Sequence, residues 1–427
     1  MRDSSKIGAW SAGALVVANM IGTGVFSSLG FQLIDTQNSW SIVLLWAIGG
    51  VIALAGALSY AESGAFFRRS GGEYHFLSQL YHPLIGYLSG WVSLTVGFAA
   101  PVALAAMALG AYVQAATDIP ARLPALLAIL VASALHSFTI RQSSSVQNWI
   151  TLLKVVLVIG FIIAGLGVAA ENNALDWSAG WTDEIMLPAF AVSLVYVTYA
   201  YTGWNAAAYI VEEIRQPERN LPKGLIVGTL LVTLLYILLQ FVFLANASLA
   251  QLTGQLEVGQ IVAGNLFGAT LGNQISLVIA LFLFSSISAM VWVGPRVSQM
   301  MAEDYRIWRF LRPKTAAGVP LRAVWFQSAL SAAFILTGTF EQILIFSGFI
   351  LQLFSALTVG GSFLLRKKGY DLPFRNPFHP LLTLVFLGAS AWILVFLLIE
   401  QPLETGLGFG IVVLGAISYF ISKNIPS

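Results

Sequence analysis

The chain has 427 residues, of which 58% are hydrophobic and only 9% are charged, and its formal net charge is +2. This composition excludes a water-soluble domain and is typical of a polytopic membrane protein surrounded by membrane lipid. The chain has no cysteine, which excludes disulfide bonds, thiolate catalysis and Cys-ligated metals, and its four histidines show no metal-ligand spacing. We therefore expect no cofactor, no metal and no nucleic-acid partner.

Apolar runs of about 20 residues, enough to cross a bilayer, follow one another along the chain. They predict an all-α membrane protein with one transmembrane domain over residues 1–427. The twelve predicted spans cover about residues 8–33, 40–62, 84–116, 121–140, 147–169, 186–212, 221–246, 270–297, 320–338, 341–365, 378–399 and 405–422.

The distribution of the 21 Lys and Arg residues predicts how these spans are oriented. With the exceptions of Arg122 and Lys154, they lie at the N-terminus, in alternate loops or at the edges of those loops. Arg141 is one of them. The opposite loops, 170–185, 247–269 and 400–404, contain acidic residues and no Lys or Arg. By the positive-inside rule, both termini of a multi-pass protein of the cell membrane are expected in the cytoplasm.

The first predicted span is interrupted at its centre by Gly22-Thr23-Gly24. Each glycine costs about 1 kcal/mol relative to alanine in a helix interior. Opened backbone is tolerated at membrane depth only where it is buried in protein or lines a cavity. The pattern therefore favours a discontinuous helix whose freed amides meet an anion, with a close helix–helix contact as the alternative.

The segment 63–83 follows the second span and mixes aromatic with charged side chains. That mixture is typical of an amphipathic helix, so we expect a cytoplasmic helix lying in the membrane interface.

The sixth span carries a matching interruption, Tyr199-Ala200-Tyr201-Thr202-Gly203-Trp204-Asn205. Spans one and six are five apart and therefore oppositely oriented. Glycine-interrupted helices in corresponding positions indicate a transporter site between inverted repeats. We expect a 5+5 inverted repeat with discontinuous helices 1 and 6: repeat 1 over about 8–169, repeat 2 over about 186–365, and helices 11 and 12 (about 378–422) outside it.

The groups exposed at the two interruptions predict the ligand. Amides near Thr23 and Gly24 suit a carboxylate, and carbonyls near Tyr199, Ala200 and Thr202 suit an ammonium, so an α-amino acid satisfies both. Neither interruption holds an acid or an arginine, which favours small or medium neutral amino acids. Asn205 either faces the substrate or braces helix 6. The expected binding residues are Ile21, Gly22, Thr23, Gly24, Tyr199, Ala200, Thr202, Gly203 and Asn205.

Several motifs, in this order, resemble those of the amino acid–polyamine–organocation superfamily. The resemblance is strongest to the L-type amino acid transporters and their bacterial relatives, exchangers of the serine/threonine or alanine-serine type. The matching motifs are Ile21-Gly22-Thr23-Gly24-Val25-Phe26, Ser70-Gly71-Gly72-Glu73-Tyr74 with Gly90-Trp91, the span-six motif above, Glu212-Glu213-Ile214, Pro217-Glu218-Arg219-Asn220-Leu221-Pro222 and Gly294-Pro295-Arg296.

The resemblance implies that broken helix 1 binds the substrate carboxylate, that broken helix 6 binds the amine, and that Tyr199 is the gating aromatic. Thr202 stands where some relatives carry an aspartate, which argues further against cationic substrates. Since the chain has no cysteine, the disulfide that joins animal members to an accessory glycoprotein is not expected. The sequence thus predicts a chain that works without a disulfide-linked accessory subunit.

Lys154 lies inside the fifth predicted span, away from its ends, where a charge is costly and indicates function by default. The alternative is that its stem snorkels to the cytoplasmic interface. In related transporters, a lysine of helix 5 replaces a sodium ion and ties helix 1 to helix 8. The resemblance therefore implies a partner at Ser286 or one of its neighbours.

These features together predict a sodium-independent secondary transporter of neutral L-amino acids, working as an exchanger by alternating access. The alternative is a proton-coupled symporter, with Lys154 releasing a proton. An enzyme or a channel is a weaker hypothesis, because the spans show neither convergent catalytic groups nor a filter motif.

Overall fold

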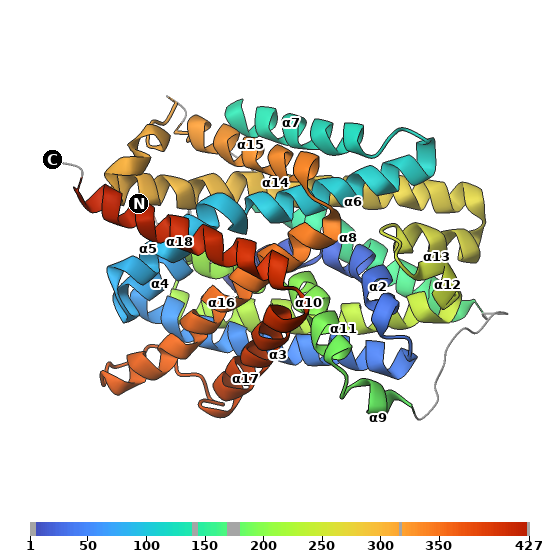
Figure 1. Cartoon of the computed structure of the whole chain (residues 1–427), viewed down its shortest axis with the longest axis horizontal. Coiled ribbons are helices and arrows are strands. Elements are labelled where there is room, and N and C mark those ends of the chain that lie inside the picture. The colour runs from blue at the N-terminus through green and yellow to red at the C-terminus, as the bar shows by residue number, and fades with distance from the viewer. Residues whose placement is uncertain (1–5, 139–143, 169–179, 316–317, 425–427) are drawn as a thin grey trace.

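The computed structural model describes residues 6–138, 144–168, 180–315 and 318–424, and this part of the chain is built from helices lying side by side (Figure 1). Arg141 and the end of predicted repeat 1 at residue 169 lie outside the described residues. In chain order, the α-helices are α1 Ala9–Met20, α2 Thr23–Asp35, α3 Ser39–Phe67, α4 Glu73–Leu80, α5 Pro83–Val92, α6 Ala99–Thr117, α7 Arg122–Phe138, α8 Ser144–Gly167, α9 Trp181–Glu184, α10 Pro188–Ala200, α11 Pro217–Asn246, α12 Leu249–Leu252, α13 Val258–Phe267, α14 Ala269–Asp304, α15 Leu321–Thr337, α16 Phe340–Lys367, α17 Leu381–Glu400 and α18 Pro402–Asn424.

Three shorter helical segments connect these elements: a π-helical turn at Ser93–Gly97 between α5 and α6, and 3₁₀ segments at Ala206–Glu213 and Arg306–Leu311. Eight helical stretches of the described chain are long and apolar enough to cross a membrane, and shorter apolar helices accompany them. The chain is therefore an all-helical, multi-span membrane protein.

The segment after α3 differs from the sequence-based expectation. α4 does not lie on a membrane surface: the side chains of Glu73, Tyr74, His75, Phe76 and Leu77 are all buried. The helix packs against α5 and α16. The prediction of an interfacial helix was wrong because an amphipathic pattern shows that one face is covered without showing whether lipid or protein covers it.

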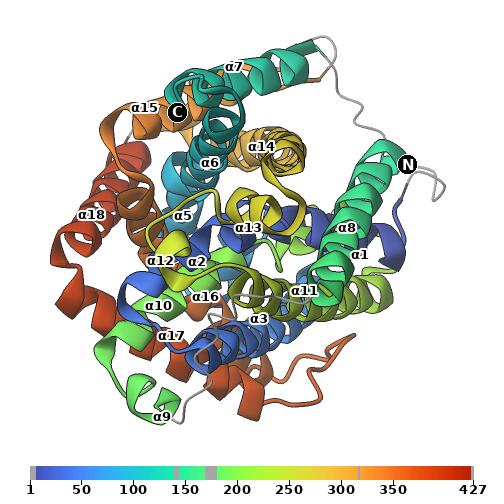
Figure 2. The same cartoon turned by 90° about the vertical axis from the view of Figure 1, so that its right-hand side faces the viewer.

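Helices from the two halves of the chain pack against each other. α3 lies against α11, α6 against α14, α7 against α15, and α2 against α10. Viewed end-on in Figure 2, α13 and the α2–α10 region lie inside the bundle, while α7, α15, α17 and α18 lie at its rim. The broken segments are therefore surrounded by other helices, which is the condition for opened backbone in a membrane protein.

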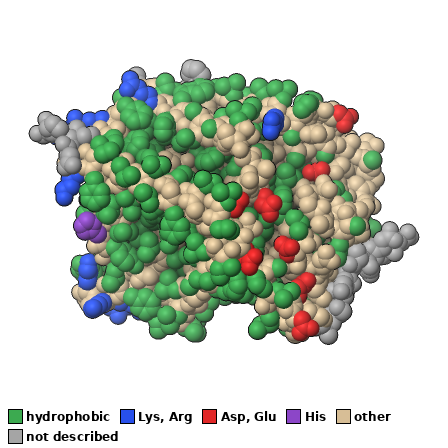
Figure 3. Space-filling model, in the orientation of Figure 1, with side chains coloured by type: hydrophobic (Ala, Val, Ile, Leu, Met, Phe, Trp, Pro, Cys, Tyr) green, Lys and Arg blue, Asp and Glu red, His purple; other side chains and the backbone are tan. Residues whose placement is uncertain are grey.

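The two ends of the bundle carry different charges. On the face shown in Figure 3, Lys and Arg gather at one end, and Asp and Glu gather toward the other. At the basic end, ion pairs join segments that are far apart in sequence: Arg68–Glu218, Arg69–Asp304, Arg296–Glu213 and Arg366–Glu62.

Both ends of the described chain lie at this basic end. The amide of Ile7 donates to the carbonyl of Glu213 at 2.8 Å. Near the other end of the chain, Ser418 hydrogen-bonds Tyr87 at 2.7 Å, and Tyr87 also accepts from Trp308 at 3.0 Å. The start and the end of the chain are thus fixed on the same side of the bundle as the basic loops.

Candidate functional site

The first interruption falls where the glycines predict it. α1 ends at Met20, α2 begins at Thr23, and the backbone of Ile21 and Gly22 between them is not helical (φ/ψ −70°/90° and −145°/−143°). Ile21 and Thr23 are buried, with 1% and 5% of their surface exposed. The break leaves carbonyls at the end of α1 and amides at the start of α2 without helical partners.

A buried lysine holds the carbonyl side of this break. Lys154 of α8, 1% exposed, donates from Nζ to Ser286 Oγ of α14 at 2.9 Å and to the Ile21 carbonyl at 3.5 Å. Ser286 itself donates to the Ile21 carbonyl at 3.4 Å. The ammonium thus joins α8, α14 and the break in α1, which is the contact that the family resemblance implies.

The start of α2 is held by packing. A Cβ built on Gly24 would lie 2.2 Å from Ala200 Cα, so α2 and α10 touch backbone to backbone at this glycine. Ala200 thus fills the space beside Gly24 in this structure, and the binding of a carboxylate there stays a prediction. At Gly22, the nearest atom to such a Cβ, Ser286 Oγ, is 3.6 Å away.

The second interruption is longer and is open on one side. α10 ends at Ala200, residues 201–205 form turns, and a 3₁₀ segment then runs over Ala206–Glu213. Gly203 has φ +103°, a conformation that side chains disfavour. An added Cβ there would also lie 2.8 Å from the carbonyl carbon of Asn19. Gly203 thus allows the turn and brings it against α1.

The carbonyls expected to receive a substrate amine have partners within the protein. Tyr199 O accepts from Thr202 Oγ1 at 2.7 Å, and Ala200 O accepts from Tyr236 Oη at 3.2 Å. A substrate ammonium would have to replace these donors, and its binding to these carbonyls stays a prediction.

Tyr236 is a site residue that the sequence reasoning missed. Its hydroxyl from α11 donates to the carbonyl of Met20 and to that of Ala200, so one side chain bridges both interruptions. It is 1% exposed. A signal was present in the sequence, because a buried tyrosine in an apolar span needs a partner for its hydroxyl. The sequence did not say which backbone would provide it.

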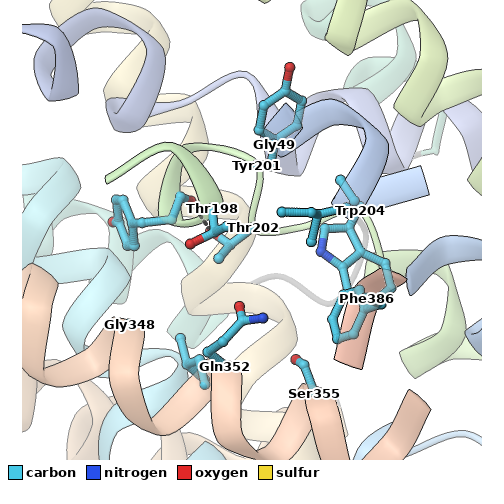
Figure 4. A pocket seen from close by; sticks show the side chains of 13 residues that line it. Gly49, Thr198, Tyr201, Thr202, Trp204, Gly348, Gln352, Ser355 and Phe386 are labelled. Atoms are coloured by element: carbon cyan, nitrogen blue, oxygen red, sulfur yellow. Dashed lines mark hydrogen bonds between the residues drawn. The ribbon is translucent and has the colours of Figure 1, made fainter. Parts of the chain in front are cut away.

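Two cavities border the second interruption. The larger, about 110 Å³, is lined by Thr202, Gly203 and Asn205, and also by Asn19 and Glu73. The smaller, about 30 Å³, lies beside Tyr199 and Thr202 (Figure 4). In that view Gln352 and Ser355 of α16 project toward the segment carrying Thr202 and Trp204. Glu73, Gln352 and Ser355 were not predicted as site residues.

The predicted binding residues of the first interruption take no part in either cavity lining. Ile21, Gly22, Thr23 and Gly24, together with Ala200 of α10, are packed against protein instead. At the acidic end, Phe31 stacks on Tyr196 and Phe340 with ring centroids 5.9 and 5.5 Å apart. Tyr196 also donates to Glu341 at 2.6 Å. These contacts join α2, α10 and α16 above the cavities.

Comparison with known proteins identifies the family of this chain. The family model described as amino acid permease matches residues 7–420. The chain belongs to the amino acid permease family.

Curated relatives of this permease are amino acid transporters. It is 30% identical over 397 residues to the human b(0,+)-type amino acid transporter 1, covering 87% of this chain and 78% of that protein. It is 25% identical to the human cystine/glutamate transporter over 423 residues, covering 96% and 83%. Over 445 residues it is 26% identical to the rabbit (Oryctolagus cuniculus) large neutral amino acids transporter small subunit 2, covering 97% and 80%.

The last of these names corrects one prediction. A relative named as a small subunit is by name one part of a larger assembly. The expectation that the permease works without an accessory subunit is therefore contradicted, and the absence of cysteine excludes only a disulfide link to such a subunit. The expectation rested on the absence of cysteine from this chain, and the make-up of one chain does not show which proteins assemble with it.

Proposed function

We propose that this permease exchanges small or medium neutral L-amino acids across the cell membrane by alternating access, independently of sodium and without chemical change to the substrate. The observation that carries the proposal is the Lys154 ammonium between Ile21 and Ser286. A fixed cation there repels Na⁺ from the carbonyl and hydroxyl oxygens that would otherwise bind it.

The proposed architecture has twelve crossings, with spans 1–5 and 6–10 as inverted repeats and spans 11 and 12 outside them. The packing of α3 on α11, α6 on α14 and α7 on α15 supports it, because each pair joins helices at equivalent positions in the two repeats. We place the basic end, with both termini, in the cytoplasm by the positive-inside rule.

The proposed binding mode places the substrate between the interruptions. Its carboxylate meets the amides at the start of α2, and its ammonium replaces the internal donors on the carbonyls of Tyr199 and Ala200. The two helices must separate slightly at Gly24 for this to occur. The relatives are named for different substrates, so family membership alone leaves the side-chain class open. The smaller cavity is lined by uncharged residues, which supports substrates with neutral side chains.

A proton-coupled symporter is the second candidate. Lys154 forms no ion pair with a described acidic residue; its described partners are a hydroxyl and a carbonyl. A lysine without a carboxylate partner releases its proton more easily than a paired one. Exchange is favoured because both partners accept from the charged form.

Counterflow in proteoliposomes tests the proposal. Purified protein is reconstituted with unlabelled alanine or serine inside, and uptake of labelled alanine is measured with and without Na⁺, with empty vesicles as the control. We expect rapid uptake that requires internal substrate and ignores Na⁺. Uptake into empty vesicles driven by an inward proton gradient would favour the symporter. Amino-acid amides and N-acetyl derivatives should compete poorly, because each lacks one of the two required charges.

A further inference from the structure

A single carboxyl group lies in the wall of the larger cavity, and the exchange mechanism proposed above does not use it. Glu73, the first residue of α4, is 5% exposed. Among the described residues that line this cavity it alone carries a formal charge. A carboxylate placed beside the broken part of a transport helix is a functional hypothesis by default.

Three neutral donors converge on one oxygen of this carboxyl. Oε1 accepts from the Tyr60 hydroxyl of α3, from Ser355 Oγ of α16 at 3.1 Å, and from Asn205 Nδ2 of the second interruption at 3.4 Å. Within the described residues no donor reaches Oε2. Glu73 therefore ties three elements around the cavity through one atom and leaves its other oxygen for a proton.

The groups that face Glu73 provide no positive charge. Tyr60 on α3 and Tyr209 on the 3₁₀ segment are titratable but neutral, and Asn205 and Ser355 are not titratable. The lining from α1, the π-helical turn, α6 and α14 is uncharged. Four arginines at this end pair with other acidic residues: Arg68 with Glu218, Arg69 with Asp304, Arg296 with Glu213 and Arg366 with Glu62.

An ionised carboxylate in such a place is unfavourable. Burying an unpaired charge is strongly unfavourable even after the protein relaxes, whereas burying a neutral carboxyl costs roughly as much free energy as burying other polar groups. The cost is smaller when the cavity is open, because water then reaches Oε2. Closing the cavity and protonating Glu73 therefore favour each other.

We propose that Glu73 is the proton-binding site of this cavity, and that the cavity closes around the substrate more readily when Glu73 carries a proton. This inference rests on the proposed exchange function. An exchanger closes once in each direction, so one proton crosses inward with one substrate and one crosses outward with the other, and no net proton transport follows.

The expected pH dependence follows from the two states of the cavity. Burial raises the pKa of Glu73 to about 7 in this structure, although hydrogen bonds from Tyr60 and Ser355 lower it. In an open, hydrated cavity the pKa should be near its ordinary value of 4.5. Closure is therefore favoured fully below the ordinary value, weakens up to about tenfold per pH unit as pH rises, and reaches its minimum above about 7.

Alanine exchange in proteoliposomes clamped at equal internal and external pH, from about 5.5 to 8.5, tests this proposal. We expect wild-type exchange to fall at least about tenfold across this range. Glu73→Gln, which mimics the neutral carboxyl, should give a flat profile and exceed wild type at pH 8.5. Glu212→Gln removes an exposed carboxyl at the same end of the protein and should follow wild type. A flat wild-type profile, or a Glu73→Gln profile parallel to wild type, would overturn the inference.

Infrared difference spectroscopy gives a readout that does not depend on transport. A protonated-carboxyl band should titrate near pH 7 in wild type and be absent in Glu73→Gln; its persistence there would contradict the assignment. If Glu73→Gln fails to give a monodisperse protein, Glu73→Asp serves instead and should keep the pH dependence with a shifted midpoint. Absence of exchange at every pH would refute the proposed function, whereas pH-independent exchange would refute only the role of Glu73.

Discussion

The two interruptions of the helices look alike in sequence but are built differently. The first is two residues long and is held by two sets of contacts. Lys154 and Ser286 donate hydrogen bonds to the Ile21 carbonyl, and Gly24 is packed against Ala200. The second covers five residues, turns at Gly203 with positive φ, and borders both cavities. A glycine in a membrane span can thus serve close packing in one helix and a turn beside a cavity in its counterpart.

The difference suggests a division of labour between the helices. In the first break the backbone is fixed by a cation and by helix contact, so the proposed carboxylate site becomes accessible only when α2 and α10 separate at Gly24. In the second break Thr202 and Asn205 lie against empty space, which suits a segment that adapts to the substrate. One hydroxyl, that of Tyr236, connects the two breaks by donating to Met20 and to Ala200.

The largest effect is expected at the packed glycine of the first break. Gly24→Ala should abolish exchange, because its Cβ would lie 2.2 Å from Ala200 Cα and backbone cannot move aside as a flexible side chain can. The matched control is Gly22→Ala, whose Cβ meets Ser286 Oγ at an ordinary 3.6 Å and should retain most exchange. Counterflow and gel filtration of both variants check this. Equal activity of the two would show that close packing at Gly24 is dispensable.

A somewhat smaller loss is expected when the cation is removed from the first break. Lys154→Ala should reduce exchange more than about tenfold, since two partners of the ammonium lose a charged hydrogen bond worth about 1.5–3 kcal/mol each. Lys154→Arg keeps the charge but changes its shape, and should retain part of the activity. The measurement is counterflow together with accumulation driven by a pH gradient. Robust, Lys154-dependent accumulation in empty vesicles would show that Lys154 carries the transported proton and does not act as a fixed cation at the first break.

Cutting the link between the breaks should have an intermediate effect. Tyr236→Phe removes the hydroxyl shared by the Met20 and Ala200 carbonyls, and leaving buried acceptors unpaired costs about 1–3 kcal/mol. We expect exchange to fall about fivefold to a hundredfold. Tyr81→Phe removes a hydroxyl that donates to Leu357 O, away from both breaks, and should leave exchange nearly unchanged. Comparable losses in both variants would show that Tyr236 has no special part in transport.

The smallest effect is expected in the second break and concerns selectivity rather than rate. Thr202→Asp places an acid beside both cavities, where a charge interacts more strongly than in water. We expect a several-fold gain in competition by lysine or arginine relative to alanine or serine. Thr202→Asn, whose side chain has the shape of aspartate but no charge, is the control. An unchanged ratio in competition assays would show that Thr202 does not face the substrate.

Much of the fold was predictable from the sequence because a membrane leaves few choices. An apolar run of about 20 residues must be helical, since the backbone finds no other partners in lipid. Glycines at mid-span indicated both interruptions. Lys154 was recognisable because burying a charge within a membrane span costs free energy. The grouping of Lys and Arg in alternate loops agreed with the basic end of the bundle.

Tertiary structure alone decided which groups face the cavities. The sequence does not show that Ala200 fills the space at Gly24, that Tyr236 reaches two carbonyls from α11, or that Glu73 reaches the second break from α4. Local patterns reveal that a face is covered and that a polar group needs a partner. The identity of that partner depends on how helices from distant parts of the chain pack, so an expected surface helix became a wall of the cavity.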